Sequence, residues 1–314
     1  MPDRTIGVTA MGGDSKQVVS TIKELEERGI KAAWLTAGGG LDNLTLFAAA
    51  AAGTDRILLG TCINTIWSRH PVAAAQQVQV IGQLAPGRFR YGIGTGHARG
   101  METTFGADFT APLGHLSEYL TLTRTLLGQG AVEFEGRFYR GTVKLAAPMP
   151  DVPVLAAALR PRAYEVCGEF ADGAISWVSP GAYLRDVALP ALRRGAERGG
   201  RSVPPLVAHV PICVSEDIEA VRTATREQLA IYPRAPFYQQ MFAEAGFPEA
   251  AETETWSDGM VEAVVFSGSE DKVSARINEL FDWGISEIIA TVVTVGDDSV
   301  ASRDRTLALL SSQS

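Results

Sequence analysis

Residues 56–94 read RILLGTCINTIWSRHPVAAAQQVQVIGQLAPGRFRYGIG, and this stretch decides the fold. It opens with a short apolar run (56–63), which is typical of a buried strand. A helical pattern follows and ends before Pro86 and Gly87, and a second apolar run occupies residues 88–94. Strand, helix and strand in this order predict a βαβ unit, which requires a parallel sheet and a right-handed crossover.

The same alternation continues along the whole chain. Apolar residues spaced as a helix face separate the strand-like runs, as with Val18, Ile22 and Leu25. Residues 131–141 alternate around a glycine and predict a hairpin outside the repeat. Eight evenly distributed units favour a closed (β/α)8 TIM barrel, in a single domain over residues 1–314, rather than an open doubly wound sheet. The eight predicted strands are 5–10, 32–36, 56–63, 88–94, 152–158, 173–178, 206–215 and 287–293.

Composition narrows the function classes. The 28 Lys and Arg against 36 Asp and Glu give a net charge of −8, which argues against nucleic acid or an anionic membrane as the main partner. No window approaches the roughly 18 apolar residues of a spanning helix, and the N-terminus does not resemble a signal peptide. The three cysteines match neither disulfide nor metal spacing, so we expect a cytoplasmic protein.

The glycine-rich stretch RFRYGIGTGHARG (88–100) has the look of a dinucleotide-binding loop. That fingerprint needs glycines at relative positions one, three and six. Counting from Gly92, the sixth position is His97, and counting from Gly94 it is Arg99. The glycines therefore need another explanation.

In a TIM barrel the active site lies at the C-terminal ends of the strands. These positions contain few carboxylates, and the four histidines (His70, His97, His115 and His209) have no metal-binding spacing. No GxSxG motif is present. A wide, largely uncharged mouth that is lined by small residues suits a flat conjugated cofactor, which glycines 92, 94 and 96 would let the backbone approach closely.

Four segments together resemble the bacterial luciferase-like flavin and deazaflavin oxidoreductases, in particular the branch that depends on the deazaflavin coenzyme F420. This resemblance implies a (β/α)8 barrel with insertions at its C-terminal mouth. It also implies a non-prolyl cis peptide at Cys62–Ile63, in a bulge that supports the middle ring of the cofactor. The segments are RILLGTCI with SRHPVAAAQQ (56–63 and 68–77), GRFRYGIGTGH (87–97), PVLAAALRPRAYEVCGEFADGAISW (153–177) and VVFSGSEDKVSARINELFDWGISEIIA (264–290).

The resemblance also assigns roles. His97 would face the substrate and supply or orient a proton, and Met11, Trp67 and Trp177 would line the substrate pocket. The phosphate would lie at residues 156–162, where helix N-terminal amides bind anions, with Arg162 nearby. The cofactor-binding positions are Thr36, Thr61, Cys62, Ile63, Gly94, Thr95, Gly96, Ala157, Ala158, Leu159 and Arg160.

Simpler interpretations stay open for several of these residues. His97 could be a loop histidine bonded to backbone, Cys62 a reactive thiol, and Arg160 an exposed first-turn residue. The aromatic residues between 232 and 242 could form a lid, a dimer face or ordinary core.

The chain departs from relatives that oxidise sugar phosphates. Those relatives have a glutamate at the position of His97, and an Asp-His pair where this chain reads Thr36-Ala37-Gly38. A lysine that they place after the sixth strand falls near Pro180. We therefore do not expect a sugar phosphate as substrate.

The leading hypothesis is an F420-dependent oxidoreductase that transfers a hydride between the deazaflavin C5 and a small organic substrate, in a homodimer and without a metal. The first alternative is an FMN-dependent, two-component monooxygenase that uses O2. The second is a non-catalytic barrel that only binds a flavin or deazaflavin.

Overall fold

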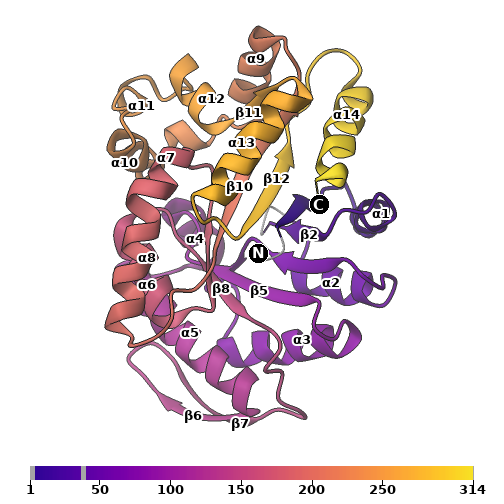
Figure 1. Cartoon of the computed structure of the whole chain (residues 1–314). Helices are drawn as coiled ribbons and strands as arrows, with labels where there is room; N and C mark the ends of the chain where they lie inside the picture. Colours follow the sequence, from indigo (N-terminus) through magenta and orange to yellow (C-terminus); the bar gives the residue numbers. More distant parts are fainter. Residues whose placement is uncertain (1–3, 37–39, 314) are drawn as a thin grey trace.

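Eight parallel strands close into a barrel in the computed structural model, which describes residues 4–36 and 40–313 (Figure 1). Closure comes from β12, which pairs with β1 on one side and with β10 on the other, while β10 also pairs with β9. All eight predicted strands are confirmed. They are β1 (Thr5–Thr9), β2 (Ala32–Leu35), β3 (Leu58–Thr61), β5 (Phe89–Gly94), β8 (Val154–Ala157), β9 (Gly173–Ser176), β10 (Leu206–Val214) and β12 (Glu287–Val292).

Helices cover the outside of the barrel and alternate with the strands. Local capping explains where several begin; the ring of His70, for example, accepts a hydrogen bond from the Val72 amide at the start of α3. The covering helices are α1 (Ser15–Glu27), α2 (Asn43–Ala51), α3 (Pro71–Leu84), α5 (Pro112–Gln129), α6 (Pro161–Phe170), α7 (Gly181–Tyr183) continuing through η1 (Leu184–Ala188) into α8 (Leu189–Arg198), α13 (Glu270–Asp282) and α14 (Ser299–Ser312).

Further elements lie outside this repeat. The predicted hairpin is confirmed as β6 (Ala131–Glu135) and β7 (Arg140–Lys144). Two short strands, β4 (Asn64–Thr65) and β11 (Phe266–Gly268), pair with β5 and β10. The remaining helices are α4 (Ala98–Phe105), α9 (Ile218–Gln228), η2 (Tyr232–Arg234), α10 (Pro236–Glu244), α11 (Ala250–Thr253) and α12 (Asp258–Val264).

Side chains fill the N-terminal end of the barrel. Trp34 is fully buried there, because Gly7 and Gly60 leave room for its ring. A Cβ atom on Gly7 would lie 2.6 Å from Trp34 Nε1, and one on Gly60 would lie 2.5 Å from the ring carbons. The buried ion pair of Arg90 and Glu287 lies beside this ring, and Trp34 Nε1 donates to Glu287 Oε1 over 3.1 Å. Only the C-terminal end of the barrel therefore remains for a site.

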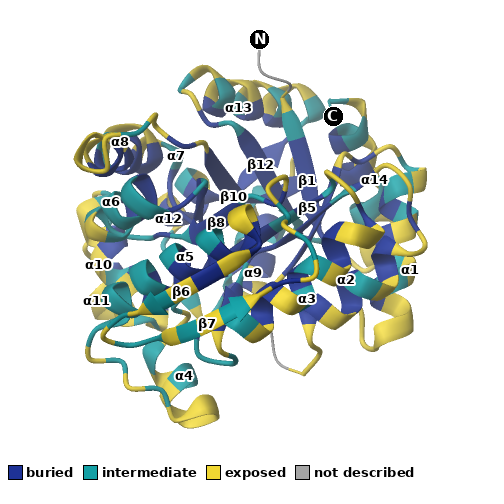
Figure 2. Ribbon diagram, turned by 90° about the horizontal axis from the view of Figure 1, so that it is seen from below, coloured by how far each residue is buried: buried dark blue, intermediate teal, exposed yellow. Residues whose placement is uncertain are grey.

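Figure 2 shows the strands as the buried centre of the molecule and α4 projecting at the end away from α13. Within the described ranges, no helix is both long and apolar enough to span a membrane.

Candidate active site

The open end of the barrel carries small and uncharged side chains. Cys62, Ile63 and Trp177 pack together with interior residues of β8 and β9. On the opposite side, the Thr9 and Thr291 hydroxyls lie 3.0 Å apart, and Thr291 also contacts the His209 ring. Such a mouth has little capacity for carboxylate acid–base chemistry.

A bulge follows β3. The cis peptide between Cys62 and Ile63 is present, and Thr61 next to it is fully buried. The Thr61 hydroxyl accepts from the Gly92 amide over 2.8 Å and donates to the Gly92 carbonyl over 2.6 Å. Burial raises the pKa of the Cys62 thiol well above its ordinary value, which disfavours the reactive-thiol interpretation.

The glycines of β5 serve two different purposes. A Cβ atom on Gly92 would lie 2.0 Å from the Thr61 carbonyl oxygen, so this glycine lets β5 approach the bulge rather than a cofactor. A Cβ atom on Gly94 would lie 3.0 Å from both Ala157 Cβ and Ile63 Cδ1. Ile63, Gly94 and Ala157 thus form a floor, named here the mouth floor, which a single added methyl group would fill.

His97 begins α4, directly after Gly96, which has a left-handed φ of 64°. Its ring stacks on Tyr238, with centroids 5.7 Å apart and planes 19° apart, and forms no cap hydrogen bond. Desolvation lowers the pKa of His97, so the imidazole is neutral near pH 7 even though the residue is exposed. The structure gives the His97 ring a contact with Tyr238 and no cap hydrogen bond, and its functional role stays a prediction.

Trp67 forms one wall beside His97. Its indole Nε1 donates to the Thr95 carbonyl over 2.7 Å, and its ring packs against Phe109 and His115. Trp67 is therefore partly a packing residue under its loop.

Trp177, Tyr232 and His209 form a group that the sequence did not predict. Trp177 stacks on His209 with centroids 3.6 Å apart and donates from Nε1 to the Tyr232 hydroxyl over 2.7 Å. Burial lowers the pKa of His209 to about 3. Tyr232, Tyr238 and Phe242 come from the segment after β10. Tyr238 contacts the His97 ring, and Tyr238 and Phe242 are buried in the hydrophobic core. The sequence signal for this group was only the density of aromatic residues there.

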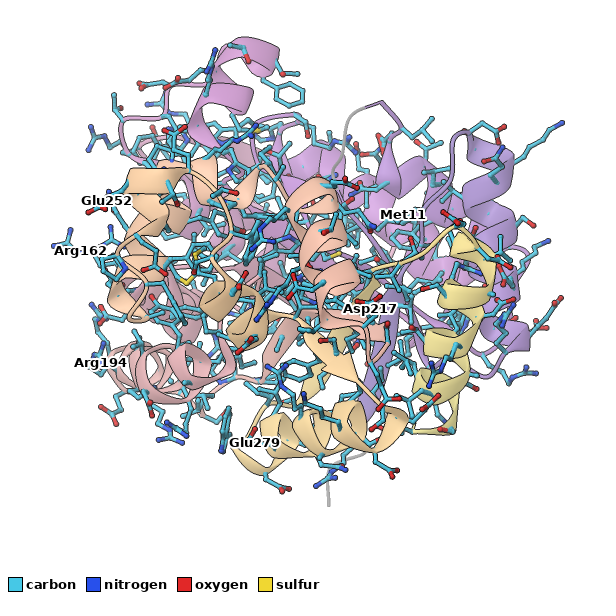
Figure 3. All side chains as sticks on the ribbon, turned by 90° about the horizontal axis from the view of Figure 1, so that it is seen from above. Met11, Arg162, Arg194, Asp217, Glu252 and Glu279 are labelled. Atoms are coloured by element: carbon cyan, nitrogen blue, oxygen red, sulfur yellow. The ribbon has the colours of Figure 1, made fainter. Side chains whose placement is uncertain are left out.

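The predicted phosphate site lies at the start of α6. Two hydrogen bonds hold the backbone of the segment that leads into α6. The Ala158 amide donates to the Ile175 carbonyl, and the Leu159 carbonyl accepts from the Tyr183 hydroxyl. No side chain caps α6, which leaves its first amides for an anion. The Arg160 guanidinium instead pairs with Glu244 over 2.6 Å and donates to Gln240, and Arg162 lies at the edge of the molecule (Figure 3).

Two predicted positions, Met11 and Thr36, are exposed just after the C-terminal ends of β1 and β2. Met11 is 66% exposed after β1, and its carbonyl accepts from the Thr21 hydroxyl (Figure 3). Thr36 is exposed at the end of β2. Ala37 and Gly38 lie outside the described residues.

Known proteins resemble this chain over most of its length. Residues 3–287 match the family described as luciferase-like monooxygenase. The chain is 24% identical over 306 residues to the 5,10-methylenetetrahydromethanopterin reductase of Methanolobus tindarius, covering 91% of this chain and 93% of that protein.

Solved structures share the fold. An F420-dependent secondary alcohol dehydrogenase, in complex with an F420–acetone adduct, superposes with a TM-score of 0.81 at 15% identity, over 99% of this chain and 98% of the other. The FMN-bound oxygenating constituent of 3,6-diketocamphane monooxygenase from Pseudomonas putida gives 0.76 at 18% identity, over 100% and 98%.

Proposed function

Because the chain belongs to the luciferase-like monooxygenase family, we propose that it is an oxidoreductase that binds coenzyme F420 and transfers a hydride to or from a small organic substrate. The observation that carries this proposal is the mouth floor, which consists of small or aliphatic, uncharged residues next to the Cys62–Ile63 bulge. The reductase relative, which matches over nearly its whole length, supports the same class of reaction.

Different residues of the chain would bind the ring system, bind the phosphate and act on the proton. Ile63, Gly94 and Ala157 would support the ring system, and the uncapped start of α6 would bind the phosphate. When bound, the deazaflavin supplies or accepts a hydride at C5. His97, which is neutral near pH 7, would orient the substrate or the proton that accompanies this transfer.

An FMN-dependent monooxygenase is the second candidate. The FMN-bound neighbour has the same fold, and FMN also presents a flat ring system and a phosphate. Cofactor identity separates the two functions, because the deazaflavin lacks the nitrogen that lets a flavin react with O2.

The test is a side-by-side fluorescence titration of the purified protein with F420 and with FMN. We expect tight binding of F420 and weak binding of FMN, followed by hydride transfer with an enone, an imine or an alcohol. A preference for FMN would overturn the proposal in favour of the monooxygenase. Tight binding of F420 without turnover of any substrate would favour a non-catalytic carrier.

A pair of glycine variants makes the titration specific for the mouth floor. Gly94→Ala adds a methyl group on the floor and should weaken F420 binding about tenfold, or roughly 1.4 kcal/mol. Gly128→Ala, in α5, is the matched control, because no other atom lies within 4 Å of its new Cβ. Equal F420 affinity in the two variants would remove the floor from the binding site.

A further inference from the structure

The Tyr232 hydroxyl has a defined role in its hydrogen bond with Trp177. An indole Nε1–H can only donate, so the Tyr232 oxygen is the acceptor in the 2.7 Å bond. The phenolic hydrogen is then left over, and among the described residues no acceptor engages it. Tyr232 therefore presents a free O–H donor at a fixed point.

The residues packed around Trp177 fix the position of this donor. Trp177 lies flat on His209, with planes 15° apart. His209 is held in turn by the Thr291 hydroxyl at Nε2 over 2.7 Å and by the Val178 amide at Nδ1 over 3.3 Å. Val178 adopts a left-handed φ of 49°, which is costly for a β-branched residue and persists only where the surroundings enforce it. Several contacts together therefore hold Trp177 in one position.

The Tyr232 hydroxyl lies at the mouth of the barrel, because its partner Trp177 directly follows the C-terminal end of β9. Trp177 packs on the interior group that contains Cys62, and the Tyr232 phenol lies close enough to the Cys62 thiol for the two to interact electrostatically. Burial raises the pKa of Tyr232, with a smaller opposing effect of the Trp177 hydrogen bond. The hydroxyl is therefore protonated at neutral pH.

We propose that Tyr232 donates its hydroxyl hydrogen to the carbonyl oxygen of the substrate, and that the substrate is an uncharged carbonyl compound or the corresponding alcohol. This inference rests on the proposed function. The neutral mouth suits a neutral ligand, since a charged one would lose its hydration without a partner of opposite charge.

In the reductive direction, the carbonyl group of the substrate becomes an alcohol. The carbonyl carbon accepts the hydride that reduced F420 supplies, the π electron pair moves to oxygen, and a new C–H bond forms. The oxygen takes the proton from Tyr232, and the phenolate, stabilised by the Trp177 N–H, regains a proton from water. In the alcohol-oxidising direction every transfer is reversed.

The test compares Tyr232→Phe and Trp177→Phe with the control Tyr139→Phe. Tyr139 is a partly buried tyrosine beside the hairpin, where its ring contacts His70 and His115. Three quantities are measured: the Kd of F420 by fluorescence, the Kd of isobutyramide (an amide that is not reduced) by NMR with ¹³C-labelled tyrosine, and kcat for cyclohexanone with reduced F420.

We expect Tyr232→Phe to keep its affinity for F420, to bind isobutyramide about tenfold more weakly, and to lose about 100-fold in kcat. Trp177→Phe should lose less in kcat, and the double variant should lose little more than Tyr232→Phe, because both residues act through one hydrogen bond.

Each other outcome overturns the inference in an identifiable way. If Tyr232→Phe equals Tyr139→Phe for isobutyramide and kcat, Tyr232 does not contact substrate. If it loses affinity for F420 as much as kcat, it is a cofactor contact. A wild-type protein that fails to bind F420 overturns the proposed function itself, whereas one that binds F420 but reduces no carbonyl compound overturns only the substrate class.

Discussion

His97 is the residue whose replacement should affect chemistry without affecting binding. Its ring stacks on Tyr238 beside the mouth, and desolvation lowers its pKa. We expect His97→Ala to reduce kcat about 100-fold and to leave the Kd of F420 within about twofold. Stopped-flow reduction or oxidation of F420, together with the fluorescence titration, measures both. Unchanged turnover would remove His97 from the mechanism.

His209 predicts a pH dependence of stability. Its folded-state pKa of about 3 is below the ordinary 6.5, so the unfolded chain binds a proton that the folded chain does not. This contribution is fully present above pH 6.5 and is lost as the pH falls from 6.5 toward 3. Between pH 7.5 and 5.5 it should remove about 1.4 kcal/mol from the free energy of unfolding.

Urea unfolding of the wild type and of His209→Gln at both pH values isolates this contribution. The variant starts from a lower stability, but the difference between its two pH values should be smaller by the predicted amount. Equal pH dependence in both proteins would mean that His209 is not neutral and buried in the fold.

Individual site residues were predictable from the sequence where a motif or a strand end defined them. Cys62, Gly94 and Ala157 were predicted in this way, and the structure brings them to one end of the barrel. The contact of Trp177 with His209 was not predictable, because it joins residues 32 positions apart whose register depends on how β9 pairs with β10.

At the level of elements, the fit of Trp34 inside the strands gives a direct stability prediction. Gly60→Ala would place a Cβ atom 2.5 Å from the Trp34 ring, which has no free space in which to move. Such overpacking should cost about 1–3 kcal/mol. The exposed helical control Gly128→Ala should instead gain up to about 1 kcal/mol. Urea unfolding measures both, and a Gly60→Ala protein as stable as the wild type would show that the ring can shift.

The strands were predictable because each is an apolar run between helical patterns, and parallel strands buried on both faces show that signal clearly. The division of the region after β10 was not predicted. The region is divided into α9, η2, α10, α11 and α12, partly because Pro233 and Pro236 each begin a new element. How these pieces return over the mouth depends on tertiary packing, which periodicity does not encode.

For the whole molecule, barrel closure depends on contacts between the first half of the chain and its last strand. β12 completes the ring by pairing with β1 and β10. Inside the barrel its first residue, Glu287, pairs with Arg90 of β5, 197 residues earlier in the chain, and accepts from Trp34. The Arg90 guanidinium also lies 4.3 Å from the centre of the Trp34 ring. This group closes the end of the barrel opposite the mouth.

Glu287→Gln should therefore destabilise the whole barrel and leave the site intact. The amide can still accept from Trp34, but Arg90 would keep a buried charge without a partner, which costs about 3–5 kcal/mol. The double variant Arg90→Met/Glu287→Gln removes that charge and should regain most of the loss.

Glu270→Gln, in an exposed pair with Arg305, is the control and should change stability far less. Urea unfolding gives the stabilities, and F420 titration of each folded variant should give the wild-type Kd. A Glu287→Gln protein no less stable than the Glu270→Gln control would mean that solvent reaches Arg90, so that the barrel is not closed at this end.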